Sequence, residues 1–245
     1  MPAVADSSAR PPLRGVVFDF DGVLADTERL HLGAYQAVLA GTGLTLDTGA
    51  YYNRYLGYDD VGVFTTLGRD QCRPLGDDEI RALIAAKGRH FDEQVRAGGV
   101  LYPDAAGCIR RLAAELPLAI ASGALHHEIE AILSGADVRQ HFRAIVAADD
   151  VERSKPAPDT YARAVELLHG NGPGLDPSAY LAVEDSVWGI TAAQAAGLPC
   201  AAITNSYPAD VLTAADLVLG SLSELEAVVL QKLGRSPEVA GQGPV

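Results

Sequence analysis

The stretch RGVVFDFDGVLADTE, residues 14–28, contains the pattern on which the fold depends. It begins with a short run of β-branched and aromatic residues and continues into two aspartates, Asp19 and Asp21. A continuous apolar run of this length is typical of a strand buried in a parallel sheet. In such sheets, ligands bind beyond the carboxyl ends of the strands. The stretch therefore predicts a strand that carries two carboxylates to a ligand-binding edge.

Four later segments repeat this pattern at spacings that leave room for helices. They are LAIAS (118–122), AIVA (144–147), YLAVED (180–185) and CAAIT (200–204). Helices are predicted at residues 105–115, behind Asp104 as a possible N-cap, and at residues 186–196, closed by Gly197 and Pro199. Alternating short strands and helices predict an α/β fold with a Rossmann-like, doubly wound parallel sheet.

The segment from about Glu28 to Gly98 interrupts this alternation. It contains no convincing strand, and its patterns LHLGAYQAVLAG and DDEIRALIAAKGRHFDEQV predict helices. The segment is far longer than a single crossover, so we interpret it as a helical cap inserted after the first strand. The predicted division is a catalytic core of residues 13–28 and 97–233, a helical cap of residues 29–96, and flexible tails at residues 1–12 and 234–245.

The composition restricts the partners and the location of the protein. Acidic residues outnumber basic ones 32 to 19 in 245 residues, and the formal net charge is −13. Extended anionic partners such as nucleic acids or membrane surfaces would be repelled. The first residues lack the apolar region of a signal peptide, and no apolar run approaches the roughly 20 residues of a membrane helix. We therefore expect a cytoplasmic monomer that acts on a small molecule.

The three cysteines are an odd number, lie far apart and lack CxxC spacing. This arrangement argues against a disulfide framework or a zinc site. We predict that Cys72, Cys108 and Cys200 are reduced thiols buried in the structure.

The ends of the predicted strands bring carboxylates and a hydroxyl to one edge of the sheet. Lys155, in SKPAPD, adds a positive charge there. Carboxylates crowded together repel one another unless a cation neutralises them, and oxygen-only ligands suit Mg²⁺. The residues that contribute at the strand ends are Asp19, Asp21, Ser122, Gly123, Glu184 and Asp185.

This combination of residues suits phosphoryl transfer, which requires positioning and positive charge around the phosphate oxygens. Asp19 is placed as the nucleophile beside a metal-held phosphate, and Asp21 as the general acid and base. Lys155, the Ser122 hydroxyl and the backbone N–H groups around Gly123 are candidates to bind the phosphate. A lone Asp-x-Asp or Ser-Gly is commonplace, so the inference depends on their joint occurrence at successive strand ends.

Four segments, FDFDGVLADTE, ASG, SKPAPD and VEDSVWGI, resemble the four motifs of haloacid dehalogenase-type phosphatases. The resemblance runs from about Arg14 to Leu233, and the position of the insertion resembles the subfamily that includes β-phosphoglucomutase and phosphoglycolate phosphatase. It implies that Asp19 is the nucleophile and a metal ligand, and that Asp21 is the acid/base and lends its backbone carbonyl to Mg²⁺. It further implies that the phosphoryl group is bound by Ser122 and Lys155, that Asp185 binds the metal directly, and that Glu184 is a ligand or supports one.

Two residues of the predicted cap, His31 and Lys87, fall near positions that resemble polar cap residues of β-phosphoglucomutase. The alternatives are that Lys87 is a solvated helix residue and that His31 is the partner of a loop carbonyl. In the segment RYLGYDDVG (54–62), Asp59 and Asp60 stand near the place where mutases carry an arginine for the distal phosphate.

Together these features predict an enzyme that hydrolyses a small phosphate monoester, of the sugar-phosphate or phosphoglycolate type, through an aspartyl-phosphate. The presence of Asp21 favours phosphate, because dehalogenases and phosphonate-cleaving relatives lack that aspartate. A β-phosphoglucomutase-like hexose-phosphate mutase is the alternative. It is disfavoured by the acidic pair and by ALHH (124–127), whose two histidines are expected to be exposed in a first helical turn. A non-enzymatic binding protein is disfavoured because a site without catalytic activity could lose any of its residues, whereas all the candidate catalytic residues are present.

Overall fold

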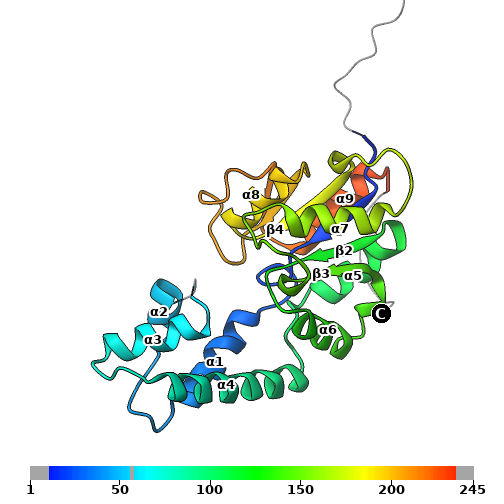
Figure 1. The fold of residues 1–245 in the computed structure, drawn as a ribbon. Helices are drawn as coiled ribbons and strands as arrows, with labels where there is room; N and C mark the ends of the chain where they lie inside the picture. The colour runs from blue at the N-terminus through cyan, green and yellow to red at the C-terminus, as the bar shows by residue number, and fades with distance from the viewer. Residues whose placement is uncertain (1–10, 56–57, 236–245) are drawn as a thin grey trace, which may run out of the picture. The chain divides into compact units, whose positions relative to one another are not determined.

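The structure is a computed structural model that describes residues 11–55 and 58–235. The chain divides into two compact units (Figure 1). The core unit is Met1–Ala25 with Leu101–Val245, and the helical unit is Asp26–Val100. Most of the predicted tail residues, 1–10 and 236–245, lie outside the described residues, as does Gly57 of the predicted cap loop.

The core unit contains a six-stranded sheet in which every neighbouring pair of strands is parallel. The order across the sheet is β3-β2-β1-β4-β5-β6. The predicted Rossmann-like α/β fold is therefore confirmed. The strands are β1 (Gly15–Phe18), β2 (Leu118–Ala121), β3 (Phe142–Val146), β4 (Tyr180–Glu184), β5 (Cys200–Ile203) and β6 (Leu217–Leu219).

The order of the strands determines where a ligand site can form. From β1 the chain proceeds to β2 and β3 on one side, and β4, β5 and β6 follow on the other side. The strand order thus reverses between β1 and β4. A crevice opens at such a switch point, beyond the carboxyl ends of the two strands. Asp19 and Glu184 lie at these two strand ends.

Helices cover the sheet so that the central strands are buried. Small side chains on one face, such as Ala119 and Ala182, join Val17 in an apolar cluster with Tyr161 and Val165 of helix α7 (Asp159–His169). Alanines on the strands let this helix approach the sheet closely. The longer helices of the core unit are α5 (Ala105–Glu115), α6 (His126–Gly135), α7 (Asp159–His169), α8 (Val187–Ala195) and α9 (Leu222–Lys232).

The starts of α5 and α8 differ in how they are capped. Ser186 caps α8 by accepting a hydrogen bond from the Gly189 amide at 3.1 Å. Asp104 precedes α5 as predicted, but its side chain makes no capping hydrogen bond. Its carboxylate instead accepts a hydrogen bond from the Ser223 hydroxyl at 3.0 Å. Asp104 therefore links the start of α5 to α9.

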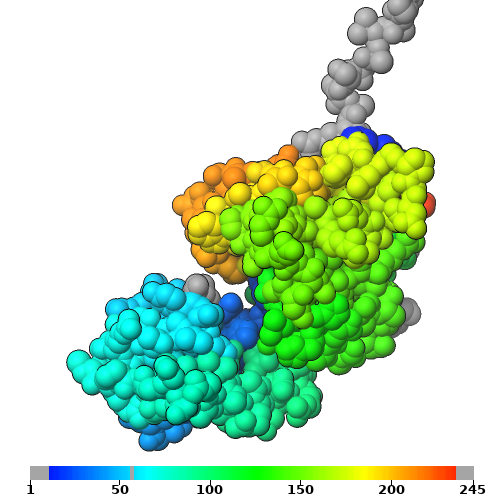
Figure 2. All heavy atoms as spheres, viewed as in Figure 1, coloured from blue at the N-terminus to red at the C-terminus, as the bar shows by residue number. Residues whose placement is uncertain are grey.

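The helical unit has its own apolar cluster, which includes Leu32, Tyr35, Phe64 and Leu83. Its helices are α1 (Thr27–Leu39), α2 (Thr48–Ala50), a π-helical turn (Tyr51–Tyr55), α3 (Asp60–Asp70) and α4 (Asp77–Ala97). The segments LHLGAYQAVLAG and DDEIRALIAAKGRHFDEQV, both predicted to be helical, lie in α1 and α4. Figure 2 shows the surface of the helical unit in the same view, with the residues of α2 and α3 in light blue and cyan.

Two of the three cysteines are buried as predicted, but Cys72 is exposed. Cys72 follows α3 in a left-handed conformation with φ of 55°, at the turn that leads toward α4. A turn residue at the surface has no apolar core to enter, which explains why the prediction was wrong for this thiol. All three thiols are free. Among the described helices, none combines the length and the apolar character needed to cross a membrane.

Candidate active site

Asp19 stands immediately after β1 and is held by three contacts. Its amide donates to the Val183 carbonyl of β4 at 2.8 Å. Its Oδ1 accepts from the Phe20 amide at 2.7 Å and lies 2.9 Å from Lys155 Nζ. The side chain is 11% exposed, so it is almost buried yet still reachable. The predicted nucleophile is therefore fixed in orientation at the switch point.

Lys155 bridges the two strand ends. Its Nζ lies 2.9 Å from Asp19 Oδ1 and 2.6 Å from Glu184 Oε1. Burial disfavours the ammonium, but the two carboxylates outweigh burial and raise the pKa of Lys155 above its usual value. Lys155 is therefore a permanent positive charge in contact with Asp19.

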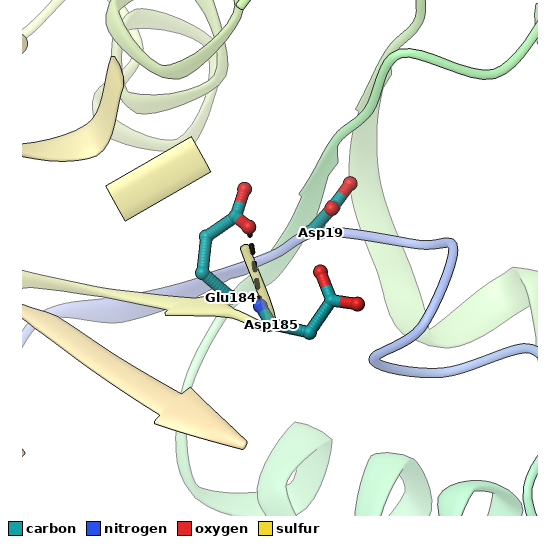
Figure 3. A group of neighbouring side chains, drawn as sticks. All are labelled: Asp19, Glu184 and Asp185. Atoms are coloured by element: carbon teal, nitrogen blue, oxygen red, sulfur yellow. Dashed lines mark hydrogen bonds between the residues drawn. The ribbon is translucent and has the colours of Figure 1, made fainter. Parts of the chain in front are cut away.

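Glu184 is fully buried and uses both carboxylate oxygens as acceptors. Oε1 accepts from Lys155 and from the Tyr161 hydroxyl at 2.8 Å. Oε2 accepts from the Asp185 amide at 3.1 Å (Figure 3) and from the Ser186 hydroxyl at 3.1 Å. These hydrogen bonds hold the carboxylate in a single orientation.

The glycine of VEDSVWGI, Gly189, is required because of the space around it. A Cβ at Gly189 would lie 1.8 Å from Glu184 Oε1, so no side chain fits there. Sequence reasoning missed Tyr161 and Ser186 as members of this network. Tyr161 lies in the first turn of α7, six positions after Lys155, and only the packing of α7 on the sheet brings its hydroxyl to Glu184.

Three carboxylates converge where β1 and β4 end (Figure 3). One oxygen each from Asp19, Glu184 and Asp185 lies within 4.8 Å of the others. Burial, followed by repulsion from Glu184, raises the pKa of Asp19 to about 7. Burial, followed by repulsion from Asp19 and Glu184, raises the pKa of Asp185 to about 8. The three carboxylates carry more negative charge than the single Lys155 ammonium can neutralise. Because all the available donor atoms are oxygens, the group fits a hard divalent cation.

Asp21 lies in the turn that follows Asp19. The turn is closed by a hydrogen bond from the Gly22 amide to the Ala25 carbonyl at 2.9 Å. Gly22 has φ of 73°, and a Cβ there would lie 1.8 Å from Asp185 Oδ2, so both conformation and space require glycine. Asp21 contributes to the raised pKa of Asp19 by repulsion, although its carboxylate is outside the group of three.

Ser122 and Gly123 follow β2, the neighbour of β1 on the opposite side from β4. Ser122 is fully buried, its amide donates to the Val146 carbonyl at 2.9 Å, and its hydroxyl accepts from the Ala124 amide at 3.1 Å. Gly123 is exposed. The structure thus places both predicted phosphate-binding residues at the same edge of the sheet as Asp19.

A histidine joins the segment after β2 to the segment that leads to Lys155. The His126 amide donates to Asp149 Oδ1 at 3.0 Å, and its Nδ1 lies 3.0 Å from Asp150 Oδ2. Its Nε2 lies 3.6 Å from Glu130. Both histidines of ALHH were predicted to be exposed: His127 is exposed, whereas His126 is only partly exposed because Asp150 and Glu130 contact its ring.

The His126 contact predicts a pH dependence of stability. The hydrogen bond to Asp150, with the charges of Asp150, Glu130 and Asp149, raises the pKa of His126 above 6.5. The stabilisation of the folded state by protonated His126 is fully present below about pH 6.5, and it is lost as the pH rises through the pKa of His126 in the folded protein. We expect the melting-temperature difference between wild type and His126→Ala to shrink from pH 5.5 to pH 8.5. His127→Ala, at the exposed neighbour, is the control, and a pH-independent difference would contradict the expectation.

Lys87 lies in α4 of the helical unit and is buried, with 8% of its side chain exposed. Its Nζ lies 2.9 Å from Asp60 Oδ1 and 5.0 Å from the centre of the Tyr35 ring. The alternative that Lys87 is a solvated helix residue is therefore wrong. Its charge is paired inside the helical unit.

His31 lies in α1 and stacks on Phe91, with ring centres 4.5 Å apart. Burial, followed by repulsion from Lys87, lowers the pKa of His31 to about 4, so the ring is neutral at physiological pH. Its Nδ1 is buried without a hydrogen-bond partner among the described residues, and the alternative of a loop carbonyl bound there is not seen.

The acidic pair of the predicted cap loop has local partners. Asp59 caps α3 by accepting from the Gly62 amide at 2.7 Å. Asp60 accepts from the Tyr35 hydroxyl at 2.5 Å and pairs with Lys87. Both carboxylates therefore stabilise the helical unit itself.

The comparisons with known proteins place this arrangement in a family. Residues 13–197 match the model of the haloacid dehalogenase-like hydrolases. The chain belongs to this family. The predicted resemblance and the prediction of an enzyme are thereby confirmed.

Relatives and solved structures of this hydrolase agree with its fold. It is 37% identical over 225 residues to the plasmid protein CbbY of Cupriavidus necator, and the aligned region covers 86% of this chain and 87% of the relative. It is 31% identical over 189 residues to fructose-1-phosphate phosphatase YqaB of Escherichia coli, over 75% and 93% of the two chains. CbbY from Rhodobacter sphaeroides, solved in complex with phosphate, superposes with a TM-score of 0.72 at 28% identity and covers 87% and 96%.

Proposed function

We propose that this hydrolase releases phosphate from a small phosphate monoester, of the sugar-phosphate or phosphoglycolate type, through an aspartyl-phosphate on Asp19. The observation that carries the proposal is the Asp19 carboxylate, held 2.9 Å from the buried Lys155 ammonium at the switch point of the sheet. A carboxylate beside a fixed positive charge can meet an anionic phosphate without the full repulsion between like charges.

Two steps account for the reaction. An oxygen of Asp19 attacks phosphorus, the bond from phosphorus to the ester oxygen breaks, and Asp21 gives that oxygen its proton. Water then attacks the phosphorus of the aspartyl-phosphate while Asp21 takes a proton from the water, which restores Asp19 and releases inorganic phosphate. Lys155 and the residues after β2, Ser122 and Gly123, are placed to hold the phosphate oxygens.

The donor set favours Mg²⁺ as the cation. The residues that would hold it are Asp19 and Asp185, through their carboxylates, and Asp21, through its backbone carbonyl. The bound cation would hold a phosphate oxygen and screen the charge of the nucleophile. Glu184 is better placed to support these ligands, because both of its oxygens already accept hydrogen bonds.

The relatives support a sugar phosphate as substrate. One is named a fructose-1-phosphate phosphatase, and others are named phosphoglycolate phosphatases. A variant of the Rhodobacter sphaeroides CbbY was solved with xylulose-(1,5)bisphosphate. Hydrolysis is also favoured over the mutase alternative. A mutase needs an unpaired positive charge for a distal phosphate, whereas Lys87 is paired with Asp60.

A turnover screen tests the proposal. We expect phosphate release from small sugar phosphates or phosphoglycolate with Mg²⁺, and loss of that release in excess chelator. We expect little conversion of β-glucose 1-phosphate to glucose 6-phosphate, even with a bisphosphate primer. Full activity in chelator would refute the metal requirement. Robust mutase turnover with negligible phosphate release would establish the mutase, and no release from any of these esters would refute the substrate class.

A further inference from the structure

The segment after β5 reaches the site, although none of the four motifs includes it. β5 lies beside β4 in parallel register, with Ala202 opposite Glu184, so its carboxyl end meets the same edge of the sheet. Two side chains from this segment contact the site. The Ser206 hydroxyl donates to Asp185 Oδ2, and Asn205 Nδ2 donates to the Gly22 carbonyl at 2.8 Å.

These contacts meet at one point. A Cβ built on Gly22 would lie 1.8 Å from Asp185 Oδ2 and 2.6 Å from Ser206 Oγ. The turn that carries Asp21, the Asp185 carboxylate and the segment after β5 are therefore packed directly against one another. A shift of the β5 segment would be transmitted to both Asp185 and the turn.

We propose that Ser206 and Asn205 are positioning residues for the metal site, Ser206 by fixing the Asp185 carboxylate and Asn205 by fixing the Asp21–Gly22 turn. This inference rests on the proposed function. With Oδ2 held by Ser206, the Asp185 carboxylate is held in one orientation beside Asp19 and Glu184. Mg²⁺ requires nearly ideal octahedral geometry with short bonds, so an Asp185 that turns freely is a poorer ligand.

The role of Asn205 differs from that of Ser206. Its hydrogen bond holds the carbonyl next to Asp21, and so sets the direction in which the Asp21 backbone carbonyl and carboxylate point. Asn205 therefore fixes the orientation of Asp21, the proposed general acid and base. Both Asn205 and Ser206 are exposed, so replacing them by alanine leaves no cavity in the core.

The test compares Ser206→Ala with a matched control, Ser223→Ala. Ser223 also donates its hydroxyl to an aspartate of the core unit, Asp104, at 3.0 Å. Mg²⁺ binding to the metal-free proteins is measured by calorimetry without substrate. We expect the dissociation constant of Ser206→Ala to rise about 10- to 100-fold, the usual effect of losing a residue that orients a metal ligand. Ser206→Thr keeps the hydroxyl and is expected to bind like wild type, as is Ser223→Ala.

Turnover separates the two roles. Phosphate release by Ser206→Ala should recover as Mg²⁺ is raised, so that the Mg²⁺ requirement changes more than kcat. For Asn205→Ala, kcat should fall about tenfold or more at saturating Mg²⁺, because proton transfer by a misdirected Asp21 is impaired. Wild-type Mg²⁺ affinity in Ser206→Ala, or wild-type kcat in Asn205→Ala, would overturn the corresponding assignment. A wild-type protein that binds no Mg²⁺ would overturn the proposed function and this inference together.

Discussion

Replacing Asp19 by asparagine is expected to abolish phosphate release while the fold survives. The amide is a poor nucleophile, and the loss should be on the order of 10⁴-fold or more, as for other covalent nucleophiles. The amide oxygen can still accept hydrogen bonds from the Phe20 amide and Lys155, which hold Asp19 in place. The measurement is the rate of phosphate release, with circular dichroism to verify folding.

Asp104→Asn is the matched control, because this aspartate belongs to the core unit but contacts Ser223 of α9. It should release phosphate at the wild-type rate. A crystal of the wild-type enzyme with beryllium fluoride should carry the phosphate mimic on Asp19. Wild-type turnover by Asp19→Asn, or the mimic on another residue, would show that the nucleophile is misassigned.

Replacing Lys155 by methionine is expected to destabilise the metal-free protein by about 3–5 kcal/mol, the usual cost of removing one partner of a buried ion pair. Asp19 and Glu184 would then face each other without the ammonium that now lies between them. Phosphate release should also fall strongly, because the phosphate loses a fixed positive charge.

The destabilisation in Lys155→Met should depend on pH. The pKa of Asp19 is already raised to about 7, so the folded state favours its protonated form. Lys155 lowers the Asp19 pKa, so its removal raises that pKa further, and the folded variant is most stable at low pH and loses stability as the pH rises toward and beyond 7. Urea unfolding at pH 5 and pH 8 measures this difference. Lys232→Met, at an exposed lysine of α9, is the control, and equal destabilisation by the two variants would contradict the prediction.

Most of the sheet was predictable because its strands are buried runs of apolar residues. Two details were missed for local reasons. β3 begins at Phe142, before the predicted AIVA segment, because the exposed Arg143 interrupts the apolar run. β6 has only three residues, all partly exposed, so its pattern is too short to distinguish from a loop. Its pairing with β5 defines it as a strand.

The site was predictable where residues stand at strand ends, and not where side chains arrive from other elements. The positions of Asp19 and Asp185 were predictable because ligands bind beyond the carboxyl ends of parallel strands, and both residues come directly after a strand. Tyr161 reaches Glu184 from inside a helix, and nothing in a helical pattern shows which polar group will be buried. Likewise, Lys87 is buried because Asp60, 27 positions earlier, meets it in space. Ser206 was missed although the CAAIT strand was predicted, because a serine in a loop is usually solvated.

The central position of β1 has a consequence for the order in which the chain folds during synthesis. Val16 of β1 pairs with Leu118 of β2 and with Leu181 of β4. The first strand to be synthesised therefore cannot complete its pairing until both later strands have been made. The helical unit, by contrast, draws its apolar cluster from residues between Leu32 and Leu83 and is complete much earlier. We therefore expect the nascent chain to carry a folded helical unit on the C-terminal side of an unpaired apolar strand. Asp19 meets Glu184 only after most of the protein has been made, so chains that stop before β4 contain the nucleophile but no site.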